Sequence, residues 1–125
     1  MKLGVDIFSL RSQPWNAFQH LEYAHQIGLD LVHFSETNFF ESLEHEYVRR
    51  LKTQADKLGL EIEVGMGSIC PTSNTFSDER GTAVEQVQEM LHVADILGSK
   101  TLRCIWVPTP TGAANCHWRR ISRPQ

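Results

Sequence analysis

Charged side chains that could contact a hydroxylated or phosphorylated small molecule stand just after apolar runs of the chain. Arg11 follows Leu3–Leu10, and Glu36 follows Leu31–Ser35. Because parallel strands carry their ligand sites beyond the carboxyl ends, both residues are candidates for substrate contacts. The alternative is an ion pair or a solvated loop charge, and the residues alone leave both readings open.

Three further candidates lie within or just after predicted strands: His33, Ser68 and Arg103. A histidine inside a strand is more often packed or hydrogen-bonded than bound to a ligand, so His33 has a structural alternative. The residues predicted to contact substrate are therefore Arg11, His33, Glu36, Ser68 and Arg103.

Two carboxylates, Asp6 and Glu63, fall inside predicted strands, where a charge is costly unless it is paired or hydrogen-bonded. A polar barrel interior would account for both. The preferred alternative is a partner on a neighbouring strand, such as Lys2 or Arg103. A catalytic role is the less favoured reading.

The six histidines do not predict a metal site. His20 and His25 are five residues apart, which does not place them on one helix face. His45 and His92 lie in helical patterns away from the strand ends. A divalent ion needs several converging ligands, and the chain offers no such set, so no cofactor is predicted for it.

A sequence pattern that occurs three times, called here the repeated phrase, predicts the secondary structure. A helical pattern ends in an apolar residue and then glycine, and a short polar link leads into an apolar run; this occurs around Gly28, Gly59 and Gly98. Glycine is the usual residue just past a helix end. Each phrase therefore predicts a helix that leads into a strand.

Regular alternation of these elements predicts an α/β fold in which parallel strands are joined by right-handed helical crossovers. The strands are expected at Leu3–Leu10, Leu31–Ser35, Leu60–Met66 and Thr101–Val107. The helices between them are expected to bury three apolar stripes: Ala17, Leu21, Ala24 and Ile27; Tyr47, Leu51, Ala55 and Leu58; and Val84, Val87, Leu91, Ala94 and Leu97. A polar lead-in at Ser77–Glu79 suits the start of the last helix.

The Gly65-Met66-Gly67-Ser68 segment lacks the spacing of a phosphate-binding loop, and close approach of backbone at a strand end accounts better for its glycines.

Composition gives no reason to expect a nucleic acid or a membrane as partner. The net charge is −3, the isoelectric point is about 6.0, and no apolar run is long enough to span a bilayer. Three cysteines without a CxxC pair argue against a disulfide framework or a zinc knuckle. With no apparent signal peptide, a cytoplasmic protein with reduced thiols is expected.

Several phrases together resemble the sugar phosphate isomerase/epimerase family, within the xylose isomerase-like TIM barrels. They are the opening Gly4–Arg11, the strand ending in Ser35-Glu36, and the segment Glu63–Pro71. The resemblance implies a metal-dependent isomerisation or epimerisation of a sugar or polyol, with manganese, magnesium, cobalt or zinc as the ion. In the family the metal ligands come from the later strands, so none can be assigned here.

The likeness covers the first 105 residues or so, which predicts a half (β/α) barrel over 1–107 and an irregular tail over 108–125. We expect a truncated or frame-shifted chain whose last twenty or so residues are not barrel sequence, and which is inactive alone. Half a barrel has two unpaired edges and an exposed apolar inner face. Self-association, or pairing with a complementing half-barrel, follows from that expectation.

Two other functions are consistent with the residues. An open α/β sheet could be a non-catalytic module that binds a small ligand or a partner subunit. A nuclease related to the AP-endonucleases is disfavoured, because the chain lacks a basic groove and a histidine-rich metal cluster.

Overall fold

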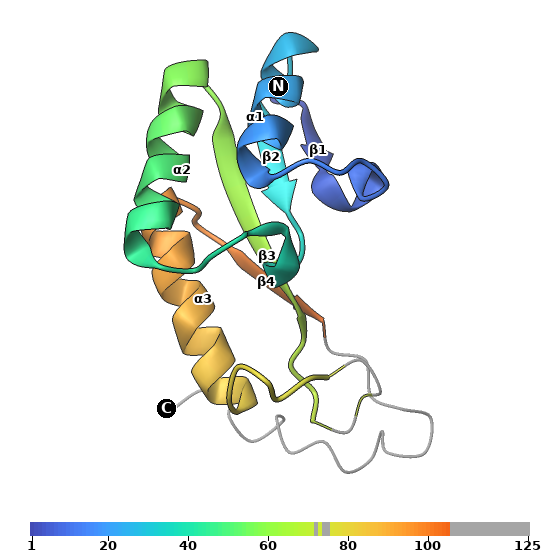
Figure 1. Ribbon diagram of the computed structural model, residues 1–125, viewed down its shortest axis with the longest axis vertical. Helices are drawn as coiled ribbons and strands as arrows, with labels where there is room; N and C mark the ends of the chain where they lie inside the picture. Colours follow the sequence, from blue (N-terminus) through green and yellow to red (C-terminus); the bar gives the residue numbers. More distant parts are fainter. Residues whose placement is uncertain (72, 74–75, 106–125) are drawn as a thin grey trace.

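Four parallel strands alternate with three helices, which confirms the predicted α/β fold (Figure 1). The computed structural model describes residues 1–71, 73 and 76–105. The strands are β1 (Gly4–Asp6), β2 (Leu31–Phe34), β3 (Glu61–Ser68) and β4 (Leu102–Ile105). The helices are α1 (Ala17–Gln26), α2 (His45–Leu58) and α3 (Ala83–Leu97), and two short 3-10 helices are η1 (Ile7–Leu10) and η2 (Thr37–Phe39). The predicted extension of the last strand to Val107 lies outside the described residues.

The sheet follows the order of the chain, β1-β2-β3-β4. Parallel strands joined in this order by right-handed crossovers carry all their helices on one face. A doubly wound sheet would instead reverse its order and place helices on both faces. The topology is therefore that of the first four strands of a (β/α) barrel.

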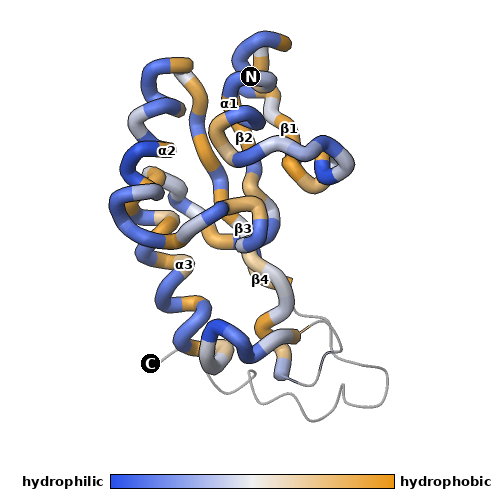
Figure 2. The backbone as a smooth tube through the Cα atoms, in the orientation of Figure 1, coloured by the Kyte–Doolittle hydropathy of each residue, from blue (hydrophilic) through white to orange (hydrophobic). Residues whose placement is uncertain are grey.

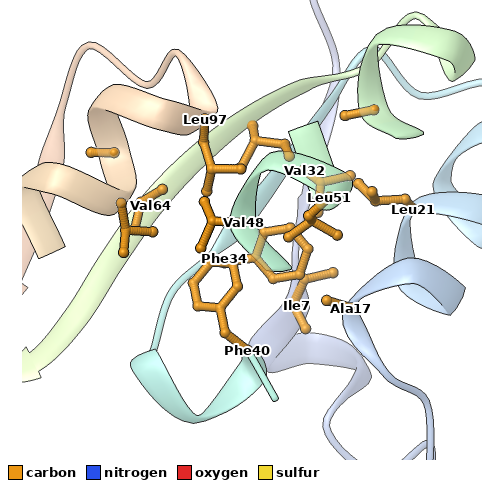
Figure 3. Packing of buried hydrophobic residues seen from close by; sticks show 14 of the residues in the cluster. Ile7, Ala17, Leu21, Val32, Phe34, Phe40, Val48, Leu51, Val64 and Leu97 are labelled. Carbon is orange, nitrogen blue, oxygen red and sulfur yellow. The ribbon is translucent and has the colours of Figure 1, made fainter. Parts of the chain in front are cut away.

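The core lies between the helices and one face of the sheet (Figure 3). From the sheet come residues such as Val32, Phe34 and Val64, all fully buried. Leu51 of α2 and Leu97 of α3 pack into the same cluster. In Figure 2 the coil of α2 is largely hydrophilic with short hydrophobic stretches, as an amphipathic helix requires.

The ends of α2 and α3 match the repeated phrase. Gly59 and Gly98 cap them with φ of 69° and 74°, in the left-handed region that residues with a Cβ rarely adopt. Their amide groups donate to carbonyl oxygens of the last helical turn, which would otherwise lack partners.

The first predicted strand is wrong beyond Asp6. The Asp6 carboxylate accepts a hydrogen bond from the amide of Phe8 at 2.9 Å, and this contact starts η1. Ile7 is fully buried as a result. The predicted strand Leu3–Leu10 is therefore a short strand, β1, followed by one helical turn, η1.

The stripe predicted for α3 is also out of phase. Val84 and Leu91 are 47% and 52% exposed, whereas Ala83, Met90 and Val93 are buried beside the expected Ala94 and Leu97. In α1, Ile27 ends the helix and is 52% exposed, although Ala17, Leu21 and Ala24 are buried as predicted. The α2 stripe is confirmed at Tyr47, Leu51 and Ala55.

The third helix begins later than its polar lead-in suggests. Thr82 is the N-cap: its hydroxyl accepts from the amide of Glu85, and the Glu85 carboxylate accepts from the amide of Thr82. This reciprocal capping box satisfies two amides that would otherwise have no partner.

The pairing of β3 with β4 is irregular. Gly65 aligns with Arg103, but Ser68 rather than Gly67 aligns with Ile105. Three steps along β3 therefore match two along β4, as in a β-bulge.

Among the described residues, no helix is long and apolar enough to cross a membrane.

His20 is the one histidine of the described core. Its ring is 2% exposed and packs edge-on against Trp15, and its Nδ1 makes no hydrogen bond among the described residues. Burial lowers the pKa of His20, because the charged imidazolium loses its hydration.

Substitution of Thr82 with alanine should lower the free energy of unfolding by about 1 kcal/mol, since the cap of α3 is lost. Urea denaturation of T82A measures this. Thr53→Ala is the matched control, because Thr53 is exposed in the middle of α2 and alanine favours a helix. Equal losses in both variants would contradict the capping role.

Acid should weaken the fold through His20. Its pKa is lower in the folded than in the unfolded chain, so the unfolded chain takes up the proton first. This contribution to stability is complete above the ordinary pKa of 6.5 and is lost as the pH falls toward the folded pKa. His20→Phe should flatten the decline in unfolding free energy below neutral pH, while His25→Gln, an exposed control on α1, should not. Parallel curves for all three proteins would rule out His20 as the cause.

Candidate functional site

Side chains of the strands alternate between the helix-covered face and the opposite face of the sheet. Val32 and Phe34 are buried under the helices, so His33 lies on the opposite face. The parallel register aligns Asp6, His33 and Glu63, and aligns Gly65 with Arg103. These four polar residues form what we call the polar row: Asp6, His33, Glu63 and Arg103. The expected apolar inner face is therefore wrong for these strands.

His33 is the centre of the polar row. Its Nδ1 lies 3.6 Å from Oε2 of Glu63, and its Nε2 lies 3.5 Å from Nε of Arg103. The first distance is too long for a hydrogen bond, and the second is a long hydrogen bond. Since an arginine nitrogen only donates, Nε2 of His33 must accept, which leaves the proton of the neutral ring on Nδ1, facing Glu63.

Arg103 also reaches past β3 to the end of β2. Its Nη2 donates to the carbonyl oxygen of Ser35 at 2.9 Å. Gly65 lies beside this path, because a Cβ there would come within 2.8 Å of the Ser35 oxygen and 3.1 Å of Nε2 of His33. The absence of a side chain at Gly65 thus lets β2 and the histidine approach β3, which confirms the expected close approach of backbone at Gly65 and not at Gly67, where an added Cβ meets nothing within 4 Å.

The polar row combines opposite hydrogen-bonding characters within a short span. Glu63 can only accept when ionised, Arg103 can only donate, and His33 does one on each nitrogen. Glu63 and Arg103 are both partly open to solvent. Neighbouring hydroxyl groups of a polyol, each both donor and acceptor, have the chemistry that such a row can bind.

The two carboxylates in strands find partners other than Lys2 and Arg103. Asp6 accepts from the amide of Phe8, and Glu63 faces His33. Lys2 pairs instead with Glu61, at the opposite end of the sheet. The predicted partner on a neighbouring strand is therefore confirmed for Glu63, whose partner is His33 of β2, and is wrong for Asp6; the suggested Lys2 and Arg103 contact other groups.

Of the five predicted contact residues, only His33 and Arg103 come together. Arg11 folds back on its own turn, with Nη1 donating to the carbonyl of Phe8 at 2.8 Å and its guanidinium over the Phe8 ring. Glu36 precedes η2 without capping it through its side chain. Ser68 is buried, and its hydroxyl accepts from the amide of Cys70.

Sequence reasoning treated Glu63 as a charge that needed a partner and did not include it among the contacts. The signal that could have found it is alternation: Glu61 and Glu63 stand two apart in β3 between buried residues, as does His33 in β2. The pairing of His33 with Glu63 also requires the register between the two strands, which a single sequence does not carry.

Two other polar groups lie near the polar row. The hydroxyl of Ser35 is buried and makes no hydrogen bond among the described residues. Cys104 follows Arg103 and packs on the helix-covered face. Burial raises the pKa of the Cys104 thiol, and the nearby Arg103 opposes this only in part, so the thiol stays protonated at neutral pH.

The polar row does not suit the divalent metal that the family resemblance implies. Within the described residues, no three histidine, cysteine or carboxylate side chains converge in a way that could hold an ion. The one histidine–carboxylate pair of the row has its second imidazole nitrogen occupied by a guanidinium, which would repel a cation.

No family model matches the chain, and no curated protein matches it either.

The lack of room for a side chain at Gly65 can be tested by comparison with Gly67, which lies two residues further along β3. Gly65→Ala should lower the free energy of unfolding by about 1–3 kcal/mol through overpacking against the Ser35 backbone. It should also shift the imidazole resonances of His33 in NMR spectra. Gly67→Ala is the control on the same strand, since an added Cβ there meets nothing within 4 Å. If the two variants behave alike, close packing at Gly65 does not hold the row together.

Proposed function

We propose that the polar row binds a sugar or a related polyol, as the substrate-contacting part of an isomerase/epimerase-type (β/α) barrel. The observation that carries the proposal is the contact of His33 with Glu63, its partner in the register, and with Arg103, which aligns with Gly65, on the face of three neighbouring strands that the helices leave open. Carboxylate and guanidinium groups are the side chains that most strongly accept from and donate to hydroxyls.

The position of the row supports the same function. In (β/α) barrels the ligand lies toward the carboxyl ends of the strands. His33 is the last residue but one of β2, and Arg103 bonds to the carbonyl of Ser35, just beyond that strand. Glu63 and Arg103 stand nearer the starts of β3 and β4, so a ligand in contact with the whole row would extend from the middle of the sheet toward the end where such barrels bind their substrates.

The resemblance of Gly4–Arg11 and Glu63–Pro71 to the isomerase/epimerase family adds the reaction class. Under this proposal the early strands hold the sugar, and the metal-dependent step is carried by ligands that the polar row does not provide. We also propose a cytoplasmic setting, which the cysteine pattern of the sequence supports.

Binding can be measured by NMR titration of the chain with a panel of aldoses, ketoses and linear polyols. We expect millimolar affinity for at least one of them, with the largest shifts at His33 and at the amides of Glu63 and Arg103. Arg103→Met should weaken binding tenfold or more, because it removes the donor and keeps much of the apolar stem. Gly67→Ala should bind as the original chain does.

Uniform lack of shifts across the panel would contradict the proposed ligand class. Shifts that persist unchanged in Arg103→Met would place the ligand elsewhere on the surface. Incubation of the bound sugar with the chain and manganese then separates two functions: conversion to an isomer supports an enzyme, and binding without conversion supports a ligand-binding module.

A further inference from the structure

We propose that His45 and His92 form a two-histidine site, on the outer surface of the helices, for a divalent transition-metal ion of the copper, nickel and zinc class. The site lies on α2 and α3, on the side of the sheet opposite the polar row. Because it shares no residue with the polar row, the inference does not depend on the proposed function.

The fold brings together two histidines that are far apart in the sequence. His45 is the first residue of α2, and His92 lies within α3. Their ring centroids are 6.3 Å apart, and the ring planes are inclined at 41°. The spacing of the histidines along the chain could not show this, because the contact depends on how the two helices pack beside each other.

The separation of the rings suits a shared ion. An imidazole nitrogen binds a zinc ion at about 2.0–2.1 Å, which places the ion about 3.2 Å from the centre of the ring. Two imidazoles on one ion therefore have centroids between about 4.5 Å and about 6.4 Å apart, from adjacent to opposite binding positions. The observed 6.3 Å lies within this range, at its upper end. Both side chains are exposed, so changes in their χ angles can turn one nitrogen of each ring toward a common point.

The backbone fixes the two positions. Val48, one turn after His45, and Val93, next to His92, are both buried in the core. The helices also meet further along, where the side chain of Lys52 lies against the glycine that ends α3. An ion would therefore order only two side chains, on helices that already lie side by side, and a small ordering cost favours binding.

Both imidazoles are available as ligands. Among the described residues, the rings of His45 and His92 make no hydrogen bond and no ion pair, and they contact each other. His20 differs, because it is buried against Trp15, and His33 differs because it contacts Arg103. The two exposed rings thus have nitrogen lone pairs that nothing else in the described structure uses.

The charges near the pair do not oppose a cation. Asp95 stands one turn after His92, and α3 carries no lysine or arginine. Arg49, one turn after His45, is the first basic residue of α2. One acid and one base on the adjacent turns largely offset each other, so the imidazole nitrogens determine which ion binds.

The ligand type then sets the class of ion. Imidazole suits zinc, copper and nickel, whereas magnesium, calcium and manganese favour oxygen ligands. Two protein ligands leave the other positions of the ion to water, so we expect micromolar affinity, with copper bound more tightly than nickel or zinc. Each imidazole must be neutral to bind, so acid should weaken the binding.

Titration of the purified chain with nickel, followed by calorimetry and NMR, tests the proposal. Paramagnetic nickel should broaden most strongly the signals of residues around His45 and His92, and magnesium should leave them unchanged. His45→Gln and His92→Gln should each raise the dissociation constant at least tenfold, because each removes one of two ligands. His25→Gln, which removes an exposed histidine of α1, is the matched control and should bind as the original chain does.

Thermal unfolding supplies a second readout, since an ion that binds only the folded chain stabilises it. Nickel should raise the unfolding temperature of the original chain and of His25→Gln, and should have little effect on the two site variants. Broadening confined to other residues would show an adventitious ion only and would overturn the proposal. Binding by either site variant as tight as that of the original chain would do the same, because one histidine would then suffice.

Discussion

This fold depends on the burial of only one face of its β-sheet. The helices α1, α2 and α3 cover a single face of the sheet, and nearly all the large buried side chains lie between them and the strands. The opposite face is then free to carry residues that a core would reject. A histidine, a glutamate and an arginine can stand on adjacent strands there because only the alternate positions must be apolar. The chemistry of the polar row is thus a consequence of the topology, in which the strand order never reverses.

Arg103 shows how that face is organised locally. It contacts β2 across β3, from the imidazole of His33 to the carbonyl of Ser35. A long, planar donor can span that distance, and a compact ammonium group could not bond both partners in the same way. Gly65, on the intervening strand, has no side chain that would clash with the Ser35 carbonyl oxygen or the His33 ring. The contacts among β2, β3 and β4 on this face therefore depend on the side chain of Arg103 and on the absence of a side chain at Gly65.

Much of the fold could be predicted from the sequence, because local signals carry it. Glycine after each helix and the change of apolar period between helices and strands are properties of short segments, and the strand–helix order follows from them. The end of β1 and the phase of α3 could not be predicted in the same way. The turn after Asp6 depends on one side-chain contact, and the exposed position of Leu91 depends on what packs beside the helix. The candidate site was only half predicted, since the partners of His33 are fixed by register and not by spacing along the chain.

The irregular pairing of β3 with β4 has a consequence for how this chain tolerates change in length. Strands of a buried sheet normally accept no deletion, since the loss of one residue moves every later side chain to the opposite face. Here β3 has one residue more than its neighbour between Gly65 and Ser68. Removal of Gly67, whose position is open to its surroundings, would leave Ser68 opposite Ile105 and restore an even ladder. We therefore expect β3 to tolerate the loss of one residue at this position, because the side chains that follow would stay on the same face of the sheet.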